Sequence, residues 1–292
     1  MFNKQINSND IITSNTNNLL HENIKIDIKE IEPTTKNINE NIFEEELSIV
    51  IDEIVDIILQ GLNEGKDEKP IKQEVLKFIN DHKIDLTELY NWLLNNQNNS
   101  NSIYMFGYLN YYGIGTDINK QKTIKLYQKA AKLENITAQL NLANMYIHGN
   151  GVDINHNKAF KLSEKLAKKG IPNAINKLGH CYHKGVGTKV DFQKAFELFQ
   201  KATDLGNSNG MINLGYCYHN GIGTEIDEQK TFELFQKAAN LGNDIAQYNL
   251  ATMYEIGNGV KKDINLAIYW YKKSAEQGYK DAQYELKRLL EN

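Results

Sequence analysis

The sequence is dominated by a two-glycine signature, Gly-x-Gly, that recurs at a fixed interval of 36 residues. The first glycines of the pairs are Gly113, Gly149, Gly185, Gly221 and Gly257, with no insertion or deletion between them. A constant period of this length is typical of a stack of equivalent structural units that each pack on their neighbours. The chain is therefore predicted to be a repeat protein, and its 292 residues need not share one compact core.

Charge is distributed unevenly along the chain. Residues 1–100 carry 9 Lys and Arg against 19 Asp and Glu, whereas residues 101–292 carry 24 against 18. Arg288 is the single arginine among the 33 basic residues. Nucleic-acid readers rely heavily on arginine, so the composition argues against a nucleic-acid partner.

Targeting signals are not visible in the sequence. The first ten residues run into further Asn and Thr without the apolar region of a secretory signal. The most apolar stretch, residues 47–62, contains Asp52, Glu53 and Asp56, which argues against a membrane span or a membrane partner. With two cysteines and no export signal, a cytoplasmic location is predicted.

The part of the chain before the repeats divides into two segments. Residues 1–41 are rich in Asn, Ile, Lys, Ser and Thr without a sustained period, and a disordered tail is predicted there. Residues 42–99 show three amphipathic patterns and are predicted to form an N-terminal helical segment, either a small bundle or a cap for the first repeat. We expect Gly61 and Gly65 to end its first helix, Pro70 to lie in the first turn of the second, and Asp85 with Glu88 to form a capping box for the third.

Each repeat is predicted to contain two helices. The A helix carries a small residue eleven positions before the first glycine, Leu or Phe seven before it and, in four units, Tyr three before it, which forms one apolar stripe. The B helix follows an Asn or Asp six positions after that glycine, the expected N-cap, and four B helices are followed by Gly170, Gly206, Gly242 or Gly278. Helices of about 11 and 14 residues, repeated, predict an all-α, right-handed αα solenoid. The predicted array spans residues 100–292, with units 102–137, 138–173, 174–209, 210–245 and 246–281 and a capping helix at 282–292.

These columns resemble the Sel-one-like repeat (SLR) family, a tetratricopeptide-repeat-like (HCP-like) helical array. The resemblance implies a non-enzymatic adaptor or scaffold that binds a protein or peptide partner. Residues 43–100, particularly Tyr90-Asn91-Trp92-Leu93-Leu94, also resemble the region that links kinase-like domains to such arrays in fungal-type proteins. That second resemblance implies a kinase or another member of a signalling complex as the partner, since the chain has no kinase motif of its own.

If the Leu-Gly-x-x-Tyr core aligns with that of tetratricopeptide repeats, the concave face is lined by A-helix residues eight, five, two and one before each first glycine. Amides spaced once per repeat can hydrogen-bond the backbone of an extended peptide. The alternative is that these are solvated positions of an Asn-rich chain. The predicted partner-binding residues are Asn141, Asn144, His148, Lys177, His180, Lys184, Asn213, Tyr216, Asn220, Asn249 and Thr252.

Each sequence feature that could indicate nucleotide binding, metal binding or catalysis has a simpler structural explanation. The Gly-x-Gly turns lack the strand and third glycine of a nucleotide fingerprint, so no cofactor is predicted. Cys181 and Cys217 lie in equivalent positions of neighbouring units, where free buried thiols are favoured over a disulfide. With His180, His183 and His219 they form the nearest approach to a zinc site, but no metal ligand and no catalytic residue is predicted. Two alternatives remain: a metal- or thiol-dependent hydrolase of the cysteine-rich repeat type, and a scaffold whose N-terminal helices carry the contact.

Overall fold

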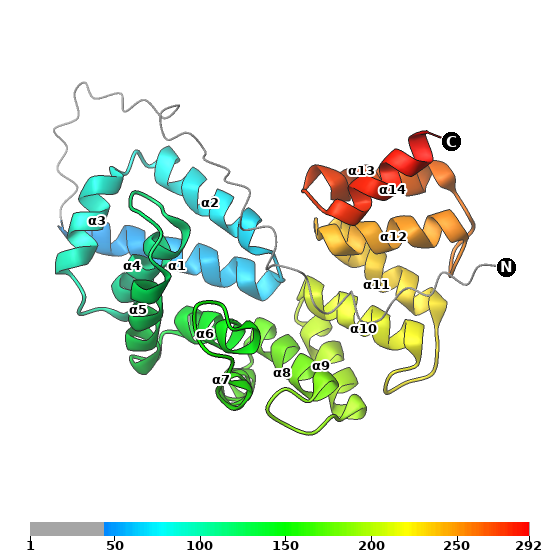
Figure 1. The fold of residues 1–292 in the computed structure, drawn as a ribbon, viewed down its shortest axis with the longest axis horizontal. Helices are drawn as coiled ribbons and strands as arrows, with labels where there is room; N and C mark the ends of the chain where they lie inside the picture. Colours follow the sequence, from blue (N-terminus) through cyan, green and yellow to red (C-terminus); the bar gives the residue numbers. More distant parts are fainter. Residues whose placement is uncertain (1–43, 292) are drawn as a thin grey trace. The chain divides into compact units, whose positions relative to one another are not determined.

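The computed structural model describes residues 44–291, which belong to one compact unit, Glu44–Asn292. The predicted tail of residues 1–41 lies outside the described residues. The described chain is all-α, with no strand, as predicted (Figure 1). Its helices are α1 (Glu44–Glu64), α2 (Glu68–Asp81), α3 (Leu86–Asn95), α4 (Ser100–Tyr112), α5 (Lys120–Lys132), α6 (Ile136–His148), α7 (His156–Lys168), α8 (Pro172–Lys184), α9 (Phe192–Asp204), α10 (Ser208–Asn220), α11 (Glu228–Asn240), α12 (Asp244–Ile256), α13 (Ile264–Glu276) and α14 (Lys280–Leu290).

The repeats form a right-handed αα solenoid in which consecutive helices pack in pairs (Figure 1). The A helices are α4, α6, α8, α10 and α12, and the B helices are α5, α7, α9, α11 and α13. Each of these helices has 13 residues, rather than the predicted 11 and 14. The A helices begin earlier than expected because Asn99, Asn135, Asn207 and Asn243 cap four of them.

The two glycines of each turn have different roles. The first glycine follows the A helix in the left-handed conformation, as Gly185 does at φ 73°. The second glycine is also left-handed, and in the second to fifth repeats it lies against the B helix of the preceding repeat, whereas Gly115 of the first repeat lies against Leu86 of α3. A Cβ atom on Gly187 would lie 2.3 Å from the carbonyl oxygen of His156, and one on Gly259 would lie 2.3 Å from that of Glu228. The second glycine therefore sets how closely neighbouring repeats pack.

The B helices have the capping residues that were predicted. Asp191 caps α9 by accepting a hydrogen bond from the Lys194 amide at 3.0 Å, and equivalent Asx residues cap the other B helices. Gly206 follows α9 at φ 81°, whereas Glu134 takes the equivalent left-handed position after α5 at φ 63°. The first repeat thus uses a non-glycine residue where its sister repeats use glycine.

Close packing inside a repeat explains the glycines that lie six positions before the first glycine of the turn in the third and fourth repeats. A Cβ atom on Gly215 would lie 2.6 Å from the Phe235 ring, and one on Gly179 would lie 2.7 Å from Phe199. The B-helix aromatic rings therefore pack directly on the A-helix backbone at these glycines.

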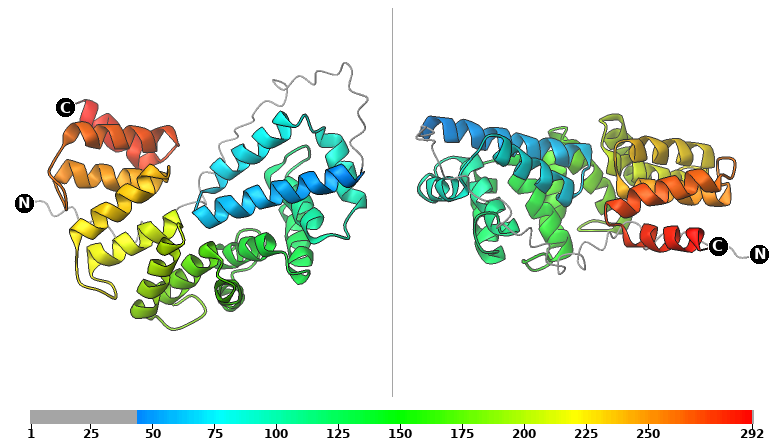
Figure 2. Two further views of the ribbon diagram at one scale, coloured as in Figure 1. Left: turned by 180° about the vertical axis from the view of Figure 1, so that it is seen from behind. Right: turned by 90° about the horizontal axis from the view of Figure 1, so that it is seen from above.

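The N-terminal helical segment covers more of the array than a cap for the first repeat would. Helix α3 packs on α4, but α1 packs on α4, α6 and α8 and also on α2 (Figure 2). The prediction that Gly61 ends the first helix is wrong, because Gly61 lies inside α1 and Gly65 follows its end at φ 77°. A Cβ atom on Gly61 would lie 2.7 Å from Ile71, so this glycine lets α1 and α2 approach each other.

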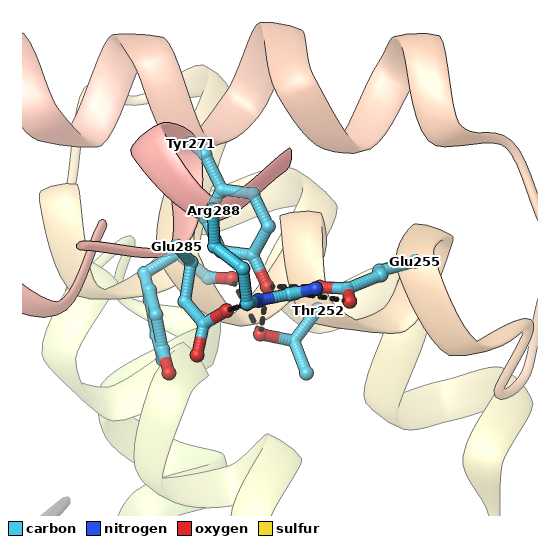
Figure 3. A network of polar contacts seen from close by, with 6 residues as sticks. Thr252, Glu255, Tyr271, Glu285 and Arg288 are labelled. Carbon is cyan, nitrogen blue, oxygen red and sulfur yellow. Dashed lines mark hydrogen bonds and ion pairs between the residues drawn. The ribbon is translucent and has the colours of Figure 1, made fainter. Parts of the chain in front are cut away.

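The C-terminal helix α14 is fixed to the last repeat by a polar network (Figure 3). Arg288 forms ion pairs with Glu285 of its own helix and Glu255 of α12. Tyr271 of α13 donates a hydrogen bond to Glu255 at 2.9 Å and lies 3.0 Å from the Thr252 hydroxyl oxygen. These contacts tie α12, α13 and α14 together at the end of the array. None of the helices in residues 44–291 has the length and apolar character needed to cross a membrane.

Candidate functional site

The predicted partner-binding residues all lie on the A helices α6, α8, α10 and α12. We call the surface formed by the side chains of α4, α6, α8, α10 and α12 the A-helix face. The structure places the predicted residues in three groups: those that link neighbouring repeats, those that serve packing or local structure, and those that form a basic cluster.

The asparagines that lie eight positions before the first glycine link neighbouring repeats. Asn141 donates a hydrogen bond to the Tyr104 hydroxyl at 2.9 Å, and Asn213 donates to the Asn176 side chain at 2.9 Å. Asn249 is buried and donates to the hydroxyl of Tyr216. In each case the acceptor lies on the preceding A helix. These side-chain amides therefore donate hydrogen bonds to the preceding repeat. The sequence had predicted that they would donate to the backbone of a bound peptide.

Three further predicted residues serve packing or local structure. Tyr216 is only 5% exposed and packs edge-on against the Phe235 ring, with 5.2 Å between ring centroids. The Thr252 hydroxyl donates to the Tyr248 carbonyl at 3.1 Å. The Asn220 side chain donates to the Tyr216 carbonyl at 3.0 Å, but Asn220 is exposed at the end of α10.

Four predicted residues from α6 and α8 come together in what we call the basic cluster: His148, Lys177, His180 and Lys184. Lys184 is exposed, and the other three are half-buried. The Lys177 ammonium donates to the predicted residue Asn144 at 3.1 Å. Loss of hydration lowers the pKa of Lys177 to about 8. The cluster therefore holds positive charge in a crowded part of the A-helix face.

His180 lies at the centre of the basic cluster and is held neutral. Loss of hydration, followed by the positive charge of Lys177 and the proximity of His148, lowers the pKa of His180 to about 3. The same loss of hydration, together with Lys177, lowers the pKa of His148. The imidazole of His180 can therefore donate or accept a hydrogen bond on this face near neutral pH without adding charge.

The shifted pKa of His180 predicts a loss of stability in mild acid. An unfolded histidine takes up a proton as the pH falls through about 6.5, whereas folded His180 does not, so the free energy of unfolding falls below that pH. The loss from this residue is about 1–2 kcal/mol at pH 5 relative to pH 8. Urea unfolding of wild type and His180→Gln at both pH values measures it, and we expect the variant to lose less stability in acid. His156→Gln, at an exposed position, is the control, and an equal pH dependence in all three proteins would contradict the prediction.

A set of polar residues that was not predicted from the sequence joins the A-helix face to the end of α1. Asn173 donates to the Leu62 carbonyl at 2.8 Å, and Asn207 donates to the Asn63 carbonyl at 2.9 Å. The Gly65 carbonyl accepts from the Ser208 hydroxyl at 3.1 Å and from the Asn209 side chain at 3.0 Å. A sequence signal was present for Asn207, because Asn recurs fourteen positions before the first glycine in four of five repeats. Locally it indicates an N-cap, which hides the second contact.

A second chain of amides ties the start of the array to the middle of α1. Asn135 caps α6 and donates to the Asn101 side chain at 2.7 Å, and Asn101 in turn donates to Asp52 at 2.8 Å. Asn243 caps α12 and reaches Asn209 at 3.3 Å in the same way. Repeats one and two, and again four and five, are thereby linked to each other and to α1.

The cysteine residues lie in the helix core. Cys181 and Cys217 are both buried and free. Burial raises the pKa of Cys181 to about 11 and that of Cys217 to about 12, so both thiols are protonated at neutral pH. Across residues 44–291 no three His, Cys, Asp or Glu side chains are placed to hold a metal ion. The five residues considered as zinc ligands do not converge.

Alternating A and B helices that pack in successive pairs define a class of protein, the αα solenoid. The profile of the Sel1 repeat matches residues 100–135, 136–171, 172–207, 208–243 and 244–279, and the chain belongs to the Sel1 repeat family. Sel1 repeats are typically protein-interaction scaffolds, and the fold is a non-enzymatic one. The predicted family and fold are thus confirmed, whereas the kinase-linking resemblance of residues 43–100 stays a prediction.

Solved structures resemble the chain to different extents. A Sel1 repeat protein from Oxalobacter formigenes is 26% identical, with 75% of this chain and 82% of that chain covered and a TM-score of 0.58. An immunity protein from Pseudomonas aeruginosa is 24% identical, with 64% and 68% covered and a TM-score of 0.48. The Helicobacter pylori cysteine rich protein B is 26% identical, with 44% and 96% covered and a TM-score of 0.38. Comparison with curated protein sequences gave no match.

Proposed function

We propose that the chain is a scaffold that binds a protein or peptide partner on the A-helix face, around the basic cluster. The observation that carries this proposal is the convergence of His148, Lys177, His180 and Lys184 from two successive A helices, with Lys184 exposed. Polar groups crowded on one rigid face provide directed contacts to a partner at little conformational cost. The neutral histidines add hydrogen-bonding groups beside the two lysines.

The surface available to this partner differs from the predicted one. Asn141, Asn213 and Asn249 hold neighbouring repeats together, so they support the face without contacting the partner. Lys184 and Asn220, at the C-terminal ends of α8 and α10, are exposed and supply the outer part of the proposed contact. The buried free thiols favour a reducing compartment such as the cytoplasm.

Site-specific photo-crosslinking in the full chain tests the proposal. A photoreactive amino acid placed at Lys184 should capture a partner from a lysate of the source organism. The same group at Lys161, an exposed lysine on the B helix α7, should not capture that partner. Capture at Lys161 but not at Lys184 would move the contact to the B helices.

The resemblance of residues 43–100 to a kinase-linking region implies that the partner is a kinase or another signalling protein. Identification of the captured protein by mass spectrometry tests this expectation. A partner captured only from a position on α1, such as the exposed Asp56, would favour a scaffold whose N-terminal helices carry the contact.

A further inference from the structure

Helix α14 covers the last repeat, and the side that it turns outward is not polar throughout. Tyr284 is 69% exposed and Leu290 is 66% exposed, which makes them the two most exposed large apolar side chains in the described part of the chain. A helix that covers the end of a solenoid is expected to present a polar outer side to solvent. The outer side of α14 therefore carries the apolar groups of a contact surface.

The orientation of α14 is fixed by the contacts on its inward side. Ala282 is fully buried, and Arg288 forms ion pairs with Glu285 of α14 and Glu255 of α12 (Figure 3). These contacts hold the rotation of the helix about its axis, so the side chains opposite them point to solvent. Because that side is held in place before any contact forms, binding through it costs little ordering of the helix. We call it the α14 face, and it consists of the exposed residues Lys280, Gln283, Tyr284, Lys287, Leu290 and Glu291.

The α14 face is complementary in charge to itself. Lys280, Tyr284, Lys287 and Glu291 follow one another at intervals of four, three and four residues, so they form one row along the helix. When two such rows lie antiparallel, Lys280 of each copy is opposite Glu291 of the other, and Tyr284 of each is opposite Lys287 of the other. The arrangement gives two Lys–Glu ion pairs and places two ammonium groups beside tyrosine rings, which attract them.

We propose that the α14 face binds the same face of a second copy of the chain, so that two arrays join through antiparallel α14 helices. A two-fold axis is the commonest symmetry of protein dimers, and it requires a surface that is complementary to itself. Leu290 lies one helical turn from Lys287 and adds apolar contact beside Tyr284 of the second copy. The inference goes beyond the proposed function, because such a dimer brings two partner-binding faces into one complex.

The length of α14 limits the strength of this contact. Eleven residues form a helix of about 16 Å, so two such helices bury less surface than the ~1,600 Å² of a standard interface. The ion pair between Lys287 and Glu291 of one helix, at 3.7 Å, is an exposed pair of small energy that can rearrange on association. We therefore expect a reversible dimer that forms at micromolar concentrations and weakens with added salt.

Sedimentation velocity of the full chain at low salt, at concentrations from about 1 to 200 μM, measures this association. We expect a monomer of 33.4 kDa at the lowest concentration and a species of twice that mass at the highest. Tyr284→Ser should weaken the dimer about tenfold or more, because it removes an apolar contact and the ring beside Lys287. Tyr269→Ser, at an exposed tyrosine of α13, is the matched control and should leave the dimer unchanged.

Charge reversal tests the antiparallel pairing itself. Lys280→Glu sets acidic groups against each other and Glu291→Lys sets basic groups against each other, so neither variant should dimerise alone. An equimolar mixture of these two variants should restore the dimer, because the reversed charges are then opposite each other. Both changes suit the helix dipole, with acid at the start of α14 and base at its end, so helicity should be kept, as circular dichroism can confirm. Lys161→Glu, at an exposed lysine of α7, is the control and should dimerise like wild type.

A chain that stays monomeric at every concentration, or a dimer that both charge reversals leave intact, would overturn the proposal. Loss of the dimer in each variant without recovery in their mixture would contradict the antiparallel pairing. A photoreactive amino acid at Tyr284 that captures other proteins from a lysate, but no second copy, would assign the α14 face to a different partner. The proposed function fails separately, if photo-crosslinking at Lys184 captures no partner, because Lys184 lies on α8 and not on the α14 face.

Discussion

Gly187→Ala is expected to destabilise the array by about 3–5 kcal/mol, because the new methyl group meets backbone that cannot move aside. Gly187 has φ 68°, and its Cβ would lie 2.3 Å from the His156 carbonyl oxygen and 2.8 Å from the Phe160 Cβ. The third repeat would have to shift away from the second, or the turn would have to change its conformation. Either change loosens the contact between neighbouring repeats.

Gly206→Ala separates the steric clash from the backbone cost. Gly206 is also left-handed, at φ 81°, but no atom lies within 4 Å of the position that a Cβ would take there, so only the conformational penalty of about 1–2 kcal/mol remains. Urea unfolding of both variants, followed by circular dichroism, measures the difference. Equal losses for the two variants would show that the second glycine serves only to permit the turn.

Leu214→Ala is expected to lower the free energy of unfolding by about 2–5 kcal/mol. Leu214 lies in the apolar stripe of α10 in the fourth repeat and is 1% exposed, so truncation leaves a cavity in a rigid core. Denaturant unfolding is again the measurement.

Leu205→Ala is the matched control for this cavity. Leu205 follows α9 and is 48% exposed, so its truncation removes little buried surface. We expect a loss of less than about 1 kcal/mol for that variant. A change within about 0.5 kcal/mol for Leu214→Ala would mean that the apolar stripe has been assigned to the wrong face.

The repeat architecture could be predicted from the sequence because it is encoded locally. Glycine is favoured where the backbone turns left-handed, and Asx side chains cap a helix through contacts only three residues away, as Asp191 does with Lys194. A 36-residue period repeats these signals, so each element has its own start and stop. Glu134 is left-handed although it is not a glycine, so a residue with a side chain can take this backbone conformation where the side chain is exposed.

The candidate site could be predicted only in part. His148, Lys177, His180 and Lys184 were placed on one face by their spacing, and the structure brings them together. The same spacing did not reveal that Asn141 and Asn249 would reach back to Tyr104 and Tyr216 of the preceding repeats. The position of a residue within the repeat fixes the direction of its side chain. It does not fix the hydrogen-bond partner of that side chain, which depends on the distance to the neighbouring repeat.

The helices, their caps, the period and hence the solenoid all follow from contacts within a few residues, so the amino-acid order is enough to specify them. The place of α1 and the covering of the A-helix face depend instead on contacts between distant parts of the chain. The contact between Asn173 and Leu62 joins residues 111 positions apart, and that between Asn209 and Gly65 joins residues 144 apart. Both asparagines look locally like ordinary residues at the start of a helix. Their second role depends on the curvature of the whole array, which no single repeat encodes.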